Sequence, residues 1–215
     1  MGNWVSGCRR GPSLEGELKV IRLAVFASGT GSNFVAIQQA IENGELKGTI
    51  ACLICDRPGA LVVERAKAFG IDTLVLSPRG FEKKTDYETA VLDYLLEKDI
   101  QLIVLAGYMR LIGPTLLKPF SSRILNIHPS LLPAFPGLHA IEKAYEARVL
   151  ETGVTIHFVD EGMDTGPILA QEALDIHPEE TLDALESRVH AIEHRLYPLT
   201  IQRVIDSLKV ESNTQ

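Results

Sequence analysis

The residue pair best suited to chemistry is an amide and an imidazole within residues 126–133, NIHPSLLP. Residues 124–128 are expected to form a buried strand, and side chains two apart on a strand face the same side, so Asn126 and His128 project together. At the carboxyl end of a parallel strand they would lie where open α/β sheets bind ligands. An amide N–H can stabilise an oxyanion while an imidazole moves a proton. The pair indicates acyl transfer, with a structural histidine as the alternative.

A second polar group, DEGMDTGP at residues 160–167, forms an acidic, glycine-containing loop between two expected strands. A carboxylate from this loop could hydrogen-bond the imidazole of His128, orient it and raise its pKa toward the working pH. Asp160, Glu161 and Asp164 all meet this description, so the residues alone do not select one. An ordinary acidic hairpin turn is the alternative interpretation.

A glycine-containing turn, SGTGSN at residues 28–33, follows the first expected strand and leads directly into a helix. Backbone N–H groups at the start of a helix suit a phosphate. A dinucleotide fingerprint would place a further glycine three residues after Gly31, where Phe34 stands instead. The turn therefore favours a mononucleotide-like phosphate over NAD. The alternative is a tight turn in which Ser32 or Asn33 caps the helix.

Composition limits the class of protein. A chain of 215 residues with 46% hydrophobic content can bury one substantial core, which indicates a single domain. The net charge of -7 argues against nucleic acid or an acidic membrane as the main partner, and small anionic ligands remain compatible with it. Without a signal peptide or a long apolar run, the chain is expected to be cytoplasmic.

Three cysteines, Cys8, Cys52 and Cys55, cannot all be paired with one another, which is consistent with reduced thiols. Cys52 and Cys55 form a C-x-x-C that could be half of a zinc site or a redox pair. They lie, however, in the apolar run of residues 49–55, which reads as a buried strand, and no second Cys/His pair accompanies them. We interpret both as core residues and expect no metal.

The remaining pattern explains how these residues are positioned. Strand and helix patterns alternate through the first half of the chain, as expected for a parallel sheet with crossover helices, and residues 102–106 should be its central strand. We therefore predict an α/β fold: one open, mostly parallel twisted sheet with flanking helices and an irregular C-terminal half. The expected strands are 20–27, 48–55, 73–76, 102–106, 124–128, 154–159 and 168–173; the expected helices are 33–43, 60–69, 84–98, 140–150 and 181–208.

The two ends of the chain are expected to lie outside this domain. Residues 1–18 are rich in glycine, serine and charge, and we predict a disordered leader. Residues 19–208 form the predicted domain, and residues 209–215 a flexible tail. Pro198 falls inside the last expected helix, where it should produce a kink.

Five strings together resemble the phosphoribosylglycinamide formyltransferase family, and the resemblance extends over residues 19–208. The NIHPSLLP string with a distant D-x-G-P is highly specific for the wider class of 10-formyltetrahydrofolate transferases. The resemblance implies a Rossmann-like formyltransferase fold. It also implies transfer of the formyl group of 10-formyltetrahydrofolate, a co-substrate, to the amine of glycinamide ribonucleotide in purine biosynthesis. The strings are ASGTGSN (27–33), LAGYMR (105–110), LNIHPSLLP (125–133), FPG (135–137) and MDTGP (163–167).

The resemblance also assigns roles to individual residues. It implies a catalytic trio of Asn126, His128 and Asp164, and a cis peptide at Leu132–Pro133. Lys84 stands where an arginine often contacts the ligand, so the planar, two-pronged donor is lost there. The implied ribonucleotide-binding residues are Gly31, Ser32, Asn33, His190 and Glu193. The implied folate-binding residues are Lys84, Met109, Arg110, Leu111, Ile112, Asn126, Asp160, Glu161, Gly162, Met163 and Asp164.

Three other functions compete with this interpretation. Methionyl-tRNA formyltransferase and formyltetrahydrofolate deformylase share the same chemistry but are expected to carry an additional domain. A non-catalytic nucleotide-binding module would need only the glycine turn, and the intact Asn126, His128 and Asp164 argue against it. The expected partners are therefore small-molecule substrates, without nucleic acid or membrane, acting on a monomer or homodimer.

Overall fold

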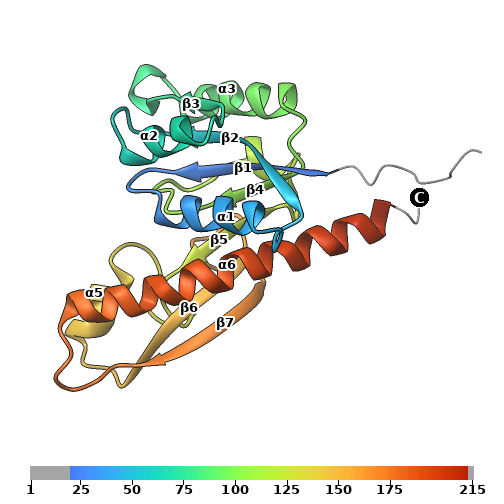
Figure 1. Cartoon of the computed structure of the whole chain (residues 1–215). Coiled ribbons are helices and arrows are strands. Elements are labelled where there is room, and N and C mark those ends of the chain that lie inside the picture. Colours follow the sequence, from blue (N-terminus) through green and yellow to red (C-terminus); the bar gives the residue numbers. More distant parts are fainter. Residues whose placement is uncertain (1–19, 213–215) are drawn as a thin grey trace, which may run out of the picture.

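The computed structural model describes residues 20–212, and a seven-stranded sheet in the order β3-β2-β1-β4-β5-β6-β7 forms the centre of this part (Figure 1). The strands from β3 to β5 are parallel, whereas β6 runs antiparallel to both β5 and β7. This confirms the α/β prediction, including the loss of strict alternation in the second half. The strands are β1 (Ile21–Ala27), β2 (Gly48–Cys55), β3 (Thr73–Val75), β4 (Leu102–Leu105), β5 (Ile124–His128), β6 (Glu151–Phe158) and β7 (Ile168–Asp175).

Helices cover both faces of the sheet and create two cores. Side chains of α1, α2, α5 and α6 pack on one face, and those of α3 and α4 pack on the other. The fully apolar strand β4 lies in the middle of the sheet, as predicted, and all its residues are buried. The helices are α1 (Ser32–Glu42), α2 (Leu61–Ala68), α3 (Lys84–Glu97), α4 (Pro114–Leu117), α5 (Ala140–Glu146) and α6 (Leu182–Ser212), with a 3-10 turn η1 (Pro78–Gly80).

The two described cysteines are core residues, as the apolar pattern predicted. Cys52 and Cys55 are both fully buried on β2, but Cys55 packs in the core beneath α1 and Cys52 in the core beneath α3. Burial raises the pKa of the Cys52 thiol to about 12, so it stays protonated. Because the side chains point to opposite faces, they cannot share a metal or form a redox pair.

Several boundaries differ from the predicted ones. The chain leaves α5 at Glu146, with Arg148 in the left-handed region at φ 53°, and β6 already begins at Glu151 because Glu151 pairs with Asp175. The short elements α4 and η1 were not predicted, since a single turn has no measurable periodicity. Residues 209–212, assigned to a flexible tail, are the last turn of α6; the predicted leader lies outside the described residues.

Helix α6 crosses the sheet and ties two central strands together (Figure 1). Tyr197 is fully buried, and its hydroxyl lies 2.8 Å from the Leu105 carbonyl oxygen and 3.2 Å from the Leu125 carbonyl oxygen. One hydroxyl therefore bridges the last residue of β4 and the second residue of β5. Within residues 20–212, no helix combines the length and apolar character needed to cross a bilayer.

Candidate active site

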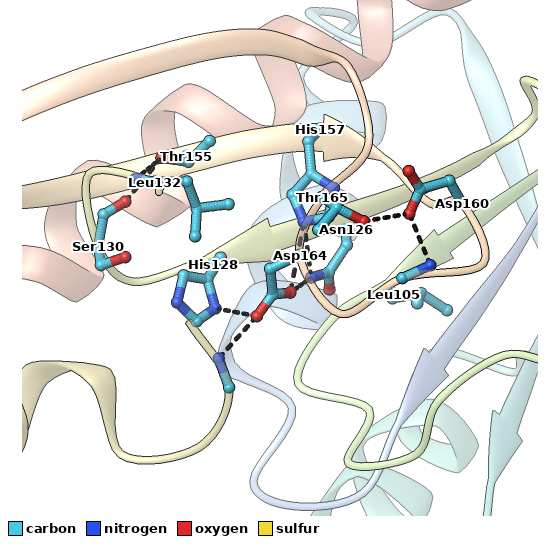
Figure 2. Close-up of polar contacts among 12 residues, drawn as sticks. Leu105, Asn126, His128, Ser130, Leu132, Thr155, His157, Asp160, Asp164 and Thr165 are labelled. Carbon is cyan, nitrogen blue, oxygen red and sulfur yellow. Dashed lines mark hydrogen bonds and ion pairs between the residues drawn. The ribbon is translucent and has the colours of Figure 1, made fainter. Parts of the chain in front are cut away.

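Asn126 is the centre of a polar cluster at the carboxyl end of β5 (Figure 2). Its Nδ2 lies 3.3 Å from Asp164 Oδ1 and 3.2 Å from His157 Nε2. The Phe158 carbonyl, 2.8 Å from His157 Nδ1, fixes a proton on Nδ1, so Nε2 accepts from the amide when the ring is neutral. When the ring is protonated, Nε2–H instead faces Asp164 Oδ1, 3.6 Å away. While the ring is neutral, both N–H bonds of Asn126 are engaged, and the longer one, to Asp164, is the weaker.

His128 lies beside this cluster with both ring nitrogens facing oxygen atoms. Nε2 is 2.8 Å from the Phe135 carbonyl oxygen, and Nδ1 is 3.5 Å from Asp164 Oδ2. The carbonyl requires a proton on Nε2, so Nδ1 is the basic nitrogen of the neutral ring. A proton that arrives at Nδ1 faces the carboxylate. The Phe135 carbonyl, rather than the predicted acidic residue, therefore selects the tautomer of His128.

Among the three predicted acids, only Asp164 faces the imidazole. The Asp160 carboxylate turns back on its own loop, where Oδ1 accepts from the Gly162 N–H at 3.0 Å and the Thr165 hydroxyl at 2.7 Å (Figure 2). Glu161 is exposed. The geometry therefore identifies Asp164 as the acid next to His128, which the residue types alone did not.

The environment of Asp164 keeps its carboxylate ionised. Burial by itself would raise the pKa, but the His157 side chain, the Gly137 N–H at 2.8 Å and the charge of His128 together lower it to about 2. Asp164 also has a left-handed backbone, φ 55°, which an aspartate tolerates better than most residues. Its carboxylate thus remains a fixed negative charge between two imidazoles.

The loop after His128 is anchored to β6 and β7. Thr155 Oγ1 accepts the Leu132 N–H at 3.1 Å, and Gln171 Nε2 donates to the Leu132 carbonyl at 3.1 Å. The Leu132–Pro133 peptide is cis, as predicted. Phe135, whose carbonyl accepts the Nε2–H of His128, has a left-handed φ of 50°. A bulky residue in this region is held there by its surroundings.

His157 is a member of this cluster that sequence reasoning missed. It is 2% exposed and lies on β6 directly opposite Asn126 in the antiparallel pair. The alternation VTIHF gave a polar residue on an apolar strand, which is the signal that could have identified it. Its relation to Asn126, however, depends on the register between β5 and β6, which the sequence does not state.

The predicted ribonucleotide residues form a second cluster where α1 meets α6. Gly31 precedes α1 with φ 77°, and no side chain caps the helix, so the alternative of a Ser32 or Asn33 cap is wrong. Asn33 Nδ2 donates to Glu193 Oε2 at 3.0 Å, and His190 Nδ1 lies 2.9 Å from the same oxygen. These residues are therefore brought together from positions far apart in the chain.

Two features of this cluster suit a polar ligand. Glu193 is 4% exposed, and Asn33 Oδ1 is buried with no hydrogen-bond partner among the described residues. Turning the amide over would place its oxygen against the Glu193 carboxylate, so the orientation is well determined. A buried acceptor without a donor is costly, and a ligand hydroxyl or N–H would satisfy it.

The predicted folate residues lie in two segments, 109–112 after β4 and 160–164 after β6. Segment 109–112 has no regular structure, and the backbone amides of residues 110–112 donate to no acceptor in the described part of the chain. Met109, Leu111 and Met163 are half exposed. Free amides beside apolar side chains match what a flat heterocycle needs.

Among the described residues, Lys84 makes no hydrogen bond or ion pair with the cluster around Asn126. It is the first residue of α3, and its ammonium group lies 3.5 Å from the Glu88 carboxylate one turn further along. Glu88 in turn accepts the N–H of Gly113, the residue immediately after the 109–112 segment. The structure thus places Lys84 near that segment through an intermediate side chain.

The formyl transferase family model matches residues 21–201. Phosphoribosylglycinamide formyltransferase of Bacillus subtilis strain 168 is 48% identical over 184 residues, which covers 86% of this chain and 94% of that protein.

Solved structures of similar sequence share the fold of this chain. Phosphoribosylglycinamide formyltransferase from Bacillus halodurans has a TM-score of 0.84 at 56% identity, covering 86% of this chain and 95% of its own. Glycinamide ribonucleotide transformylase 1 from Geobacillus kaustophilus has a TM-score of 0.84 at 54% identity, covering 86% and 98%.

Proposed function

Because this chain belongs to the formyl transferase family, we infer that it performs the reaction for which these relatives are named, formyl transfer to phosphoribosylglycinamide. The chain is a transferase of purine biosynthesis. The observation that carries this inference is the contact of one carboxylate, Asp164, with both His128 and Asn126 at the carboxyl end of β5. An oxyanion donor and a proton carrier held by one fixed charge suit acyl transfer.

The geometry supports a division of roles among the three residues. The ribonucleotide amine attacks the formyl carbon, the bond from that carbon to the donor nitrogen breaks, and one amine proton passes to the departing nitrogen. His128 Nδ1 takes this proton, because Nε2 is committed to the Phe135 carbonyl, and Asp164 stabilises the resulting cation. Asn126 releases its long contact with Asp164 and donates that N–H to the oxyanion.

We propose that the formyl donor is 10-formyltetrahydrofolate. Segment 109–112, with the free amides of residues 110–112, would accept the flat ring, and the 160–164 loop would form the opposite wall. Lys84 belongs to the same set by resemblance. The phosphate of the ribonucleotide would lie on the backbone of Gly31, Ser32 and Asn33. Glu193, which contacts Asn33 and His190, would lie near the other end of the ribonucleotide.

A turnover assay tests the proposed function. Purified protein with 10-formyltetrahydrofolate should release tetrahydrofolate only when glycinamide ribonucleotide is present, in equal amounts to formylglycinamide ribonucleotide. His128→Ala, which removes the proton carrier, should abolish most of this release. Release without ribonucleotide would identify a deformylase instead, and no release at all would reject both functions.

Ribonucleotide affinity should depend on pH through His190. The hydrogen bond to Glu193 raises the His190 pKa, although burial opposes it, so the ring keeps its proton to a higher pH than a free imidazole. When the ring is charged, Nδ1–H donates to Glu193 and Nε2–H is a second donor for the anionic ribonucleotide; when it is neutral, Nε2 is an acceptor, and that donor and the positive charge are lost. Because the raised-pKa cation is lost as pH rises, the ribonucleotide Kd should rise about fivefold between pH 6.5 and pH 9.

The control for this prediction is His190→Gln, which keeps a hydrogen-bonding side chain without a titrating charge. Calorimetric Kd values for this variant should be flat over the same pH range. An equally steep rise in the variant would assign the pH dependence to another group.

We also propose that the protein acts on small molecules alone, as a cytoplasmic monomer or homodimer. The net charge of -7 disfavours contact with nucleic acid or an anionic lipid surface. No metal is part of the proposed mechanism, since a carboxylate, an imidazole and an amide supply its charge and proton transfers.

A further inference from the structure

We propose that Glu88 is a positioning residue for the folate, and that Lys84 acts on the folate through Glu88 rather than by contact. The proposal rests on the proposed function, because it concerns the segment 109–112 expected to receive the folate ring. It assigns a role to a buried carboxylate on α3 that takes no part in the chemistry.

The first observation is how tightly Glu88 joins the end of this segment. Glu88 is 3% exposed, and its Oε1 accepts the Gly113 N–H at 2.7 Å. A Cβ on Gly113 would lie 2.5 Å from Oε2 and 2.8 Å from Oε1, so only glycine lets the carboxylate approach. A charge that is this buried is costly unless it is paired and hydrogen-bonded. The hydrogen bond from Gly113 therefore holds the Glu88 carboxylate in one orientation.

The second observation explains Lys84. Its ammonium lies 3.5 Å from the Glu88 oxygen that holds Gly113, and no other cation pairs with Glu88 among residues 20–212. Lys84 stands in the first turn of α3, where the positive end of the helix disfavours a cation. The position is therefore poor for helix stability but suits a counter-charge for the buried carboxylate.

The other end of the segment is held in a comparable way. The Met109 N–H donates to Ser28 Oγ at 3.0 Å, and the Ser28 hydroxyl donates to Asp56 Oδ1 at 2.6 Å. Ser28 and Asp56 are both buried. Buried polar side chains thus fix Met109 and Gly113, while the amides between them stay free.

This arrangement has an energetic consequence for ligand binding. A segment held at both ends presents its free N–H groups in one conformation, so a flat ring binds without first ordering the loop. Loss of Glu88 should release the segment and weaken folate binding. It should not affect the ribonucleotide, whose residues lie on α1 and α6.

The test measures Kd for tetrahydrofolate and for glycinamide ribonucleotide, with kcat and KM for each substrate, on a set of variants. Glu88→Leu should raise the folate Kd and KM about tenfold, with ribonucleotide Kd unchanged and kcat at saturating folate within about twofold. Glu88→Gln keeps an acceptor for Gly113 and should restore most of the affinity. Gly113→Ala, which displaces the carboxylate from the other side, should reproduce the Glu88→Leu result even if Glu88→Leu fails to fold.

The role of Lys84 is tested by placing Lys84→Met in two backgrounds. In the wild type it should weaken folate binding, and in Glu88→Leu it should cause no further loss, because it acts through the residue already removed. The same loss in both backgrounds would assign Lys84 to direct contact and overturn this half of the proposal. Unchanged folate affinity in both Glu88→Leu and Gly113→Ala would overturn the other half.

Failure of the proposed function looks different. Wild-type protein that binds no tetrahydrofolate would reject the folate reaction itself, and the positioning proposal with it. Wild-type binding together with unaffected variants rejects only the proposal.

Discussion

Replacing Asp164 with asparagine should lower the single-turnover rate by a factor on the order of a hundred while ribonucleotide affinity stays nearly unchanged. The substitution keeps the shape of the side chain but removes the charge that faces His128 Nδ1 at 3.5 Å. The imidazolium formed during transfer then loses its stabilising partner, so the loss falls on the transition state rather than on binding. Rapid-quench measurement of formyl transfer gives this rate directly.

Two controls make the Asp164 result interpretable. Glu146→Gln removes an exposed carboxylate from α5, away from the proposed site residues, and should leave the rate normal. The double variant His128→Ala with Asp164→Asn should cost much less than the product of the two single losses, because the pair acts as one unit. Fully multiplicative losses, or a normal rate for Asp164→Asn, would contradict the proposed pairing.

The pKa of Asp164, lowered to about 2, separates it from other titrating groups. A depressed folded-state pKa contributes stability above the unfolded value, and this contribution is lost only as pH falls through about 2. The carboxylate is therefore fully charged throughout the physiological range. Any loss of activity between pH 7 and pH 5 reports a different group.

Gly31→Ala should be the most damaging single change in the turn before α1, residues 28–33. Gly31 has φ 77°, and a Cβ there would overlap the side chain of Val62. We expect about 2 to 4 kcal/mol lower free energy of unfolding, from left-handed strain plus overlap, and at least about tenfold weaker ribonucleotide binding. Chemical denaturation and calorimetry measure the two effects separately.

Matched glycines distinguish the causes. A Cβ on Gly29 meets nothing within 4 Å and its φ is not positive, so Gly29→Ala should change little. Gly44 has φ 76° but equally open surroundings, so Gly44→Ala should report the strain alone. If Gly31→Ala binds ribonucleotide normally, the phosphate does not lie on this turn.

Much of the fold could be predicted because it depends on local pattern. Strands β2 and β5 have the predicted bounds, since each is an apolar run that meets polar or glycine residues at its ends. The first residues of β6 were missed for the opposite reason. Residues 151–153, ETG, have no apolar alternation, and it is the pairing of Glu151 with Asp175 on β7 that makes them a strand.

The candidate site was predictable in its residue types but not in its connections. The residues around His128 gave the amide and imidazole, whereas Phe135 acts through its carbonyl, which no side-chain pattern encodes. Asp164 and Asp160 differ by four positions in one loop, and only backbone geometry decides which one faces the imidazole. Glu88 was read as part of a helix, since its partner Gly113 lies 25 residues away.

The bond between Asn33 and Glu193 joins positions 160 residues apart, which has a consequence for the protein during its synthesis. A ribosome that has made β1 to β7 has already produced the turn before α1 and the side chains of Asn126, His128 and Asp164, yet Glu193, His190 and Tyr197 have not been translated. The nascent chain therefore cannot complete the proposed ribonucleotide subsite or bridge β4 and β5 through Tyr197. Activity is expected to begin late in translation, once α6 has emerged from the exit tunnel.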